Sequence, residues 1–164
     1  MKFAEVELRQ ITEDTWKIVL EEELELSSPP VTPAAIEDSI AACAHITGDW
    51  QLAVVLTCTI TAARQAAIVM FATTQAEEKP DDIQDAMCEL INIIAGNIKG
   101  VLSGSSHLAF SNLVKGQDFK LLFPRHLLLS EVHYTYRGEP LCVRLLGEDR
   151  LSARVQDTET NADP

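Results

Sequence analysis

The sequence predicts an α+β domain in which an antiparallel or mixed β-sheet is packed by two long central helices, with a further helix at the N-terminus. Three observations predict this class. Apolar residues recur at helical spacing in three segments, and strand-like runs occur both before and after the two central helices. Short turns join most of those runs, so a doubly wound parallel sheet is not expected.

The first third of the chain predicts a helix followed by two strands. Segment 4–22 has apolar residues at helical spacing, and the Ser-Ser-Pro-Pro run at 27–30 stops the predicted helix. Segments 36–47 and 51–60 predict two strands, joined by a turn at the Gly-Asp-Trp sequence between them. The second strand is almost continuously apolar, as expected at the centre of a sheet.

Two helices are predicted next. Segment 61–74 is rich in Ala and predicts a helix, whose inner side we expect to carry Ala63, Ala67, Met70 and Phe71. Segment 82–102 predicts a longer helix, which we expect Asp81 or Asp82 to cap.

The last third predicts strands again, at 107–114, 118–123, 127–136 and 141–146. The Arg-Gly-Glu-Pro sequence between the last two predicts a hairpin turn. We expect one domain over 1–147, followed by a disordered tail over 148–164, because that polar segment contains no aromatic residue.

Composition excludes several classes of partner. The net charge is −12, from 25 acidic and 13 basic residues, which argues against nucleic acid and against anionic membrane surfaces. No apolar run is long enough to cross a bilayer, and the N-terminus does not have the pattern of a signal peptide. We therefore expect a cytoplasmic protein.

The predicted helix 82–102 has two different faces. At about 100° per residue, one face is an apolar stripe that we expect to pack on the sheet. This stripe consists of Ile83, Met87, Leu90, Ile94, Ile98 and Val101. The opposite face, spaced by four, three, four and three residues, carries Asp85, Glu89, Asn92, Gly96 and Lys99. Glu89 and Asn92 are neighbours at i and i+3, so both side chains reach the same region outside the helix.

Gly96 is the unusual residue of the polar face. A Gly within a helix costs about 1 kcal/mol relative to Ala, and its benefit here would be room for another backbone beside Asn92. A short amide such as Asn92 suits the orientation of a water molecule or an oxyanion. The residues alone leave two alternatives open, a functional surface and an ordinary solvated face.

The segment DAMCELINIIAGNIKGVL (85–102) resembles the active helix of the CheX/CheC/FliY chemotaxis phosphatases. In that family Glu, two residues, Asn, three residues and Gly follow one another, with a Lys nearby. The resemblance is to CheX rather than CheC, because this chain has one ExxN helix where CheC-like chains usually carry two. Segments 46–72 and 110–116 also resemble the family, although Ser111 and Asn112 stand where the family often has Pro.

The resemblance implies a CheC-like fold and hydrolysis of the aspartyl phosphate of a phosphorylated CheY-like response regulator. It implies that Asn92 positions the attacking water, that Glu89 contacts the regulator's active-site lysine, and that Asp85, Gly96 and Lys99 contact the partner. It implies no cofactor of the chain's own, Mg²⁺ on the partner regulator, and a homodimer. The alternative is a receiver-domain binding module of the same fold without catalysis. A flagellar switch component, which would carry further domains, is less favoured.

Neither the cysteines nor the histidines form a recognisable motif. The cysteines lie far apart without a CxxC pair, so we expect buried free thiols at Cys43, Cys58, Cys88 and Cys142. The histidines share no metal-ligand spacing, so we expect structural or surface roles for His45, His107, His126 and His133.

Overall fold

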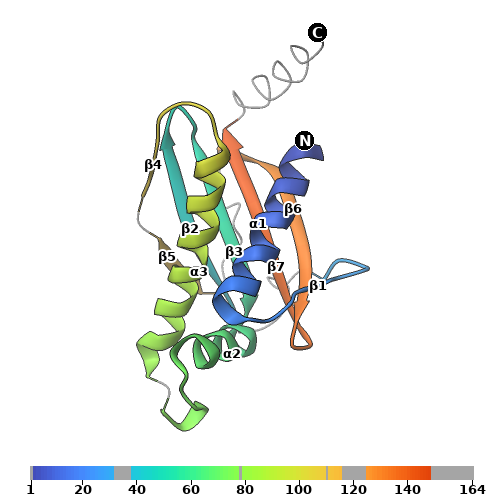
Figure 1. Cartoon of the computed structure of the whole chain (residues 1–164), viewed down its shortest axis with the longest axis vertical. Coiled ribbons are helices and arrows are strands. Elements are labelled where there is room, and N and C mark those ends of the chain that lie inside the picture. Colours follow the sequence, from blue (N-terminus) through green and yellow to red (C-terminus); the bar gives the residue numbers. More distant parts are fainter. Residues whose placement is uncertain (1, 32–37, 78, 110, 116–124, 149–164) are drawn as a thin grey trace.

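The computed structural model describes residues 2–31, 38–77, 79–109, 111–115 and 125–148. Over this part of the chain, three α-helices pack on a seven-stranded sheet in which every strand pair is antiparallel (Figure 1). The predicted α+β class is therefore confirmed, and the sheet is antiparallel rather than mixed. The predicted strand at 118–123 and all but the first residue of the predicted tail lie outside the described residues.

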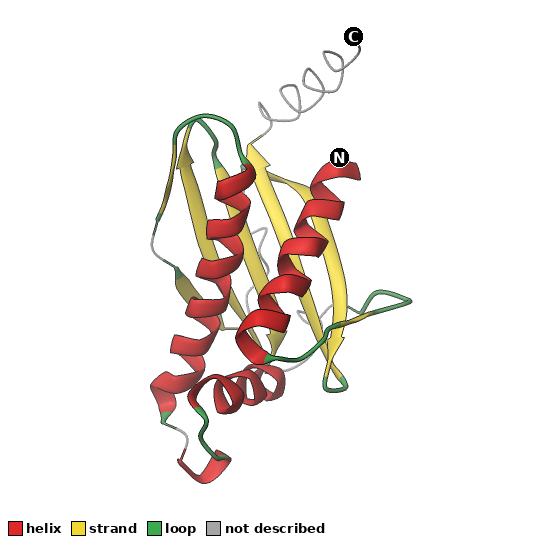
Figure 2. Ribbon diagram, in the orientation of Figure 1, coloured by secondary structure: helices red, strands yellow, loops and turns green. Residues whose placement is uncertain are grey.

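All three predicted helices are present. Their bounds are α1 Lys2–Leu20, α2 Ile60–Phe71 and α3 Pro80–Val101, with a single 3₁₀ turn, η2, at Gln75–Glu77. The long helices α1 and α3 lie side by side across one face of the sheet, and the shorter α2 lies at one end of it (Figure 2). The sequence predicts that the two long helices packing on the sheet are those at 61–74 and 82–102. In the structure the N-terminal helix is one of the two, because α2 has only 12 residues.

The strands follow the order β1-β6-β7-β3-β2-β4 across the sheet, and β5 also pairs with β2. Their bounds are β1 Glu25–Leu26, β2 Ser39–Gly48, β3 Leu52–Thr59, β4 Ser106–Leu108, β5 Asn112–Lys115, β6 His126–Tyr136 and β7 Glu139–Glu148. β3 is central and buried along its whole length, as its apolar sequence predicted. β7 continues one residue beyond the predicted domain boundary at 147.

The segment predicted as one strand over 107–114 forms two short strands. Leu108 of β4 pairs with Ile46, whereas Asn112 of β5 pairs with Cys43, so the two strands pair with β2 in registers that differ by one residue. This shift in register separates β4 from β5. The strand β1 was not predicted at all, because two residues that pair only with Tyr134 and Thr135 carry no periodic signal.

Both predicted hairpin turns are present and depend on glycine. Gly48, before the β2–β3 turn, has a φ of 114°, and a Cβ there would lie 2.6 Å from the carbonyl oxygen of Ser105. Arg137 and Gly138, between β6 and β7, have φ values of 49° and 82°. Positive φ at two successive turn residues is the requirement of a tight two-residue hairpin, so this turn is shorter than the four residues predicted.

The hydrophobic core lies between the sheet and the helices. Trp16 is buried and meets Tyr136 edge-on, with ring centroids 5.5 Å apart. On α2 the predicted inner residues Ala63 and Ala67 are buried, but Phe71 is 41% exposed, so its placement on the inner side was wrong. Phe71 is the last residue of α2. None of the described helices is both long and apolar enough to span a membrane.

Candidate functional site on helix α3

The inner face of α3 packs on the sheet and on its neighbouring helices. Its buried residues are Ala86, Met87, Leu90, Ile91, Ile94, Ala95 and Ile98. This face matches most of the predicted apolar stripe, but Val101 is 57% exposed and its assignment to the stripe was wrong. Val101 is the last residue of the helix, and periodicity indicates its direction without showing that another element lies there.

The outer face of α3 carries the predicted polar residues. Asp85 and Glu89 are exposed, whereas Asn92, Gly96 and Lys99 are half-buried at the border of the packed region. Because the opposite side of the helix is buried against the sheet, this row of five residues is directed away from the core. The structure therefore places all five predicted residues along one outward-facing side of one helix.

Two glycines leave this face open. A Cβ at Gly96 would meet no atom within 4 Å, and the same is true of Gly100, one turn later. Packing within the chain therefore gives no reason for glycine at either position. Gly100 was not among the predicted site residues, although the sequence GNIKG places it four residues after Gly96.

Two polar side chains of this face, Glu89 and Asn92, have no partner within the described part of the chain. Among the described residues, neither Glu89 nor Asn92 makes a side-chain hydrogen bond or an ion pair. Asn92 offers both a carbonyl oxygen and an amide N–H, and Glu89 offers a carboxylate one helical turn away. Both groups are thus available to a molecule that docks on the outer face of α3.

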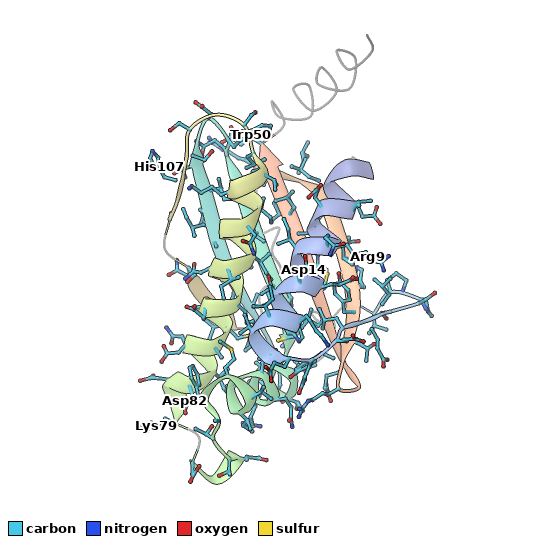
Figure 3. The ribbon with its side chains drawn as sticks, viewed as in Figure 1. Arg9, Asp14, Trp50, Lys79, Asp82 and His107 are labelled. Atoms are coloured by element: carbon cyan, nitrogen blue, oxygen red, sulfur yellow. The ribbon has the colours of Figure 1, made fainter. Side chains whose placement is uncertain are left out.

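Both ends of α3 are held in place. At the N-terminal end, the Asp82 carboxylate accepts a hydrogen bond of 2.9 Å from the backbone N–H of Lys79. Lys79 is the N-cap residue, so Asp82 stabilises the helix from its third position rather than as the predicted N-cap. Beyond the C-terminal end, Trp50 Nε1 donates to the carbonyl oxygen of Ser103 over 2.7 Å. Figure 3 shows Trp50 at one end of the helix and Lys79 and Asp82 at the other.

The loop after α3 is also tied to the β2–β3 turn. Asp49 N–H donates to the carbonyl oxygen of Ser105 over 3.0 Å, and Ser105 N–H donates to the Asp49 carboxylate over 2.8 Å. Together with the bond from Trp50, these contacts fix where the helix ends. With its inner face buried and its C-terminal end tied to the β2–β3 turn, α3 presents its outer face in a constant position, which a site that works by positioning requires.

Three of the four cysteines are poorly suited to act as nucleophiles. Cys43, Cys58 and Cys142 are buried free thiols, as predicted, and Cys88 is half-buried. Burial raises the pKa of Cys43 to about 11 and the pKa values of Cys58 and Cys142 to about 12. These three thiols therefore remain protonated at neutral pH and are poor nucleophiles.

A family model described as "Chemotaxis phosphatase CheX" matches residues 40–136, which is more than half of the 164 residues and includes all of α3. The chain belongs to the CheX chemotaxis phosphatase family. No match to a curated protein sequence was found. The family resemblance inferred from the helix sequence is thereby confirmed.

Solved structures of CheX and FliY proteins share the fold of this chain at low sequence identity. CheX from Desulfovibrio desulfuricans is 17% identical with a TM-score of 0.68, over 90% of this chain and 100% of that chain. A CheX–CheY–BeF₃–Mg²⁺ complex from Borrelia burgdorferi is 14% identical with a TM-score of 0.66, over 87% of this chain and 97% of that chain. FliY from Thermotoga maritima is 12% identical with a TM-score of 0.62, over 95% of this chain and 91% of that chain. At these identities the likeness establishes the CheC/CheX-like fold.

Proposed function

We propose that this CheX-family protein hydrolyses the aspartyl phosphate of a CheY-like response regulator, using the outer face of α3 as its half of the active site. The observation that carries the proposal is the pair Glu89 and Asn92 beside Gly96. The two polar groups face outward without a described partner, and the glycine beside them has open space around it. Family membership and the solved complex of a CheX with CheY support the same partner class.

In this proposal Asn92 positions the attacking water. The amide oxygen of Asn92 accepts a hydrogen bond from the water, and its amide N–H donates another. A single side chain can therefore orient the nucleophile toward phosphorus. Hydrolysis of an acyl phosphate needs little covalent chemistry from the protein, and in-line positioning supplies most of the rate. Asn92 is held on a helix whose inner face is buried and whose C-terminal end is tied to Trp50, which keeps that geometry constant.

Glu89 has a different role in the proposal. Its exposed carboxylate is one turn before Asn92, and we assign it to the active-site lysine of the regulator. That ion pair would place the two proteins in register, with Asp85 and Lys99 as outer contacts on the same face. Because the pair forms only in the complex, removing Glu89 should weaken association more than the chemical step.

The Mg²⁺ of the reaction is assigned to the regulator, as in the complex of CheX and CheY that contains Mg²⁺. Among the described residues, the one group of three side chains close enough to ligate a metal lies on β6 and β7 and includes no residue of α3. In the proposal the chain's own contribution is therefore limited to holding the water and the partner. The metal supplies charge neutralisation of the phosphoryl group from the regulator's side.

The test compares two asparagines of the same helix. Loss of phosphate from a phosphorylated regulator is measured with wild type, Asn92→Ala and Asn97→Ala. Asn97 is exposed and lies on another side of α3, so its variant makes the same chemical change at a different position of the same helix. We expect Asn92→Ala to reduce the stimulated rate by at least about 100-fold and Asn97→Ala to leave it unchanged.

Two results would contradict the enzyme assignment. One is equal rates for Asn92→Ala and Asn97→Ala with both variants folded by circular dichroism. The other is a wild-type protein that does not speed phosphate loss from any regulator tested. If that protein still bound a regulator carrying BeF₃⁻, the non-catalytic binding module would be the correct alternative. Glu89→Ala should weaken this binding, and unchanged binding would refute the role given to Glu89.

We propose that the chain also forms a homodimer, in agreement with its family resemblance. On its outer edge, β6 pairs with β1 only at Tyr134 and Thr135 among the described residues. Leu127 and Leu128, near the other end of this edge strand, are 45% and 42% exposed. An open edge with exposed leucines favours strand pairing with a second copy. Light scattering after gel filtration tests this, and a Leu128→Lys variant should be monomeric.

The single domain over 1–147 and the cytoplasmic location remain predictions. Limited proteolysis tests the first, because cleavage confined to residues after 147 would leave one stable fragment.

A further inference from the structure

Three potential metal ligands meet on the helix-free face of the sheet. Glu131 and His133 are two residues apart on β6, and Cys142 is directly opposite His133 on β7. The residues that alternate with them, Val132, Tyr134, Leu141 and Val143, are in the core on the helix side. Glu131, His133 and Cys142 therefore lie on the opposite side of the sheet from α1 and α3, away from the proposed phosphatase site.

The distances fit a small metal ion. His133 Nε2 is 3.4 Å from Glu131 Oε2 and 3.8 Å from Cys142 Sγ, and the three atoms all lie within 4.8 Å of one another. Tetrahedral zinc with bonds of about 2.0–2.3 Å to nitrogen, oxygen and sulfur separates neighbouring ligand atoms by about 3.4–3.6 Å. Two of the three separations are thus already close to those of a zinc site.

The ligand set and its surroundings favour zinc. We propose that Glu131, His133 and Cys142 bind Zn²⁺, with a water molecule in the fourth position. A combined sulfur, nitrogen and carboxylate set suits this borderline-soft ion better than Mg²⁺ or Ca²⁺. His133 Nδ1 is 3.2 Å from the carbonyl oxygen of Val31, so this nitrogen donates there and Nε2 is left as the ligand atom. Such an outer hydrogen bond is usual for a histidine that binds zinc.

The site is shielded yet reachable. Cys142 is fully buried and the His133 side chain is 9% exposed, whereas the Glu131 side chain is 39% exposed and gives access from solvent. Arg144 Nε lies 3.2 Å from the same Glu131 oxygen, so Zn²⁺ has to displace this contact. Affinity should therefore be lower than in a site without a competing cation. Binding replaces the thiol proton of Cys142 and releases it to solvent.

The site goes beyond the proposed phosphatase activity, and its function would be to stabilise the sheet. A bound ion would join β6 to β7 and, through His133, to the segment at Val31. An ion that binds only the folded chain raises the temperature of unfolding. This consequence can be measured without any response regulator.

The test uses the full chain with Co²⁺ as a spectroscopic probe and Zn²⁺ as the competitor. Wild type should show a thiolate-to-Co²⁺ charge-transfer band that Zn²⁺ removes, and Zn²⁺ should raise its unfolding temperature. Cys142→Ser should lose the band, and Glu131→Gln should weaken Zn²⁺ binding by at least about tenfold. The matched control is Cys43→Ser, which removes another buried thiol on the same side of the sheet and should keep the band.

Several outcomes would overturn the proposal. The proposal fails if the wild type takes up no Zn²⁺ after equilibration with an equimolar amount. It also fails if the charge-transfer band persists in Cys142→Ser. If Cys43→Ser lost the band as completely as Cys142→Ser, the loss would reflect removal of a buried thiol and not removal of a metal ligand. If Cys142→Ser does not fold, Glu131→Gln decides the matter, because its side chain is partly exposed and the substitution conserves its size. Unchanged Zn²⁺ affinity in that variant refutes the site.

Discussion

Replacing Gly96 by Ala should make the protein more stable and less active. Gly in the interior of a helix is less favourable than Ala by about 1 kcal/mol. A Cβ at Gly96 meets no atom within 4 Å, so no clash offsets the gain. For a chain of 164 residues, a gain of about 1 kcal/mol raises the unfolding temperature by about 2–4 °C.

Activity should change in the opposite direction. Gly96 is one turn after Asn92, about 6 Å along the helix axis, where a docked backbone would come close. A methyl group there holds the partner off, and a displacement of about 1 Å costs about 100-fold in rate. The gain in stability and the loss of activity thus have one structural origin, the open surface beside Asn92.

Gly100→Ala is the control. Gly100 also has open surroundings, so the same substitution should give a similar gain in unfolding temperature. It is about 12 Å along the axis from Asn92, and the stimulated loss of phosphate should be much less affected. Differential scanning calorimetry and the phosphate-release assay measure the two effects. The reasoning fails if Gly96→Ala lowers the unfolding temperature, or if both variants retain equal activity.

Three further predictions concern stability and are measured by urea denaturation. Thr59→Ala should lower the free energy of unfolding by about 1–2 kcal/mol, because Thr59 Oγ1 accepts the 3.2 Å hydrogen bond from Ala62 N–H at the start of α2. An unchanged urea midpoint would contradict this. Ile94→Ala should cost about 2–5 kcal/mol and Val101→Ala less than about 0.5 kcal/mol, and equal losses would refute the assignment of the two faces of α3. Burial, together with the nearby charge of His126, lowers the pKa of His45 below its ordinary 6.5. The unfolded chain therefore binds a proton more readily than the folded chain, and stability falls as the pH drops below 6.5. His45→Gln should show a smaller loss over this pH range, and an equal loss would be evidence against the effect.

The helices were the most predictable part of the fold. Their apolar residues repeat every three or four positions within one segment, and such a pattern needs no knowledge of the rest of the chain. All three helices were found within a few residues of their observed bounds. The errors were at helix ends, where Phe71 and Val101 continue the apolar pattern but have no neighbouring element to cover them.

Strand pairing was less predictable. The two-residue strand β1 exists only because it meets β6, and β4 and β5 pair with β2 in registers that differ by one residue. Neither feature leaves a periodic trace in the segment itself. Pairing depends on which distant residues are opposite one another, which is a property of the sheet and not of the strand.

The sequence by itself determined the row on α3. Glu89, Asn92 and Gly96 share one helix, so their spacing alone placed them together, and the same spacing carried the family resemblance. Only the tertiary structure decided that the surface at Gly96 is open, because clearance depends on every other element of the fold. It also brought His133 opposite Cys142, residues that looked unrelated in the sequence, because antiparallel pairing of β6 and β7 sets their register. Residues on one helix are related by local geometry, whereas residues on two strands are related only after the sheet has formed.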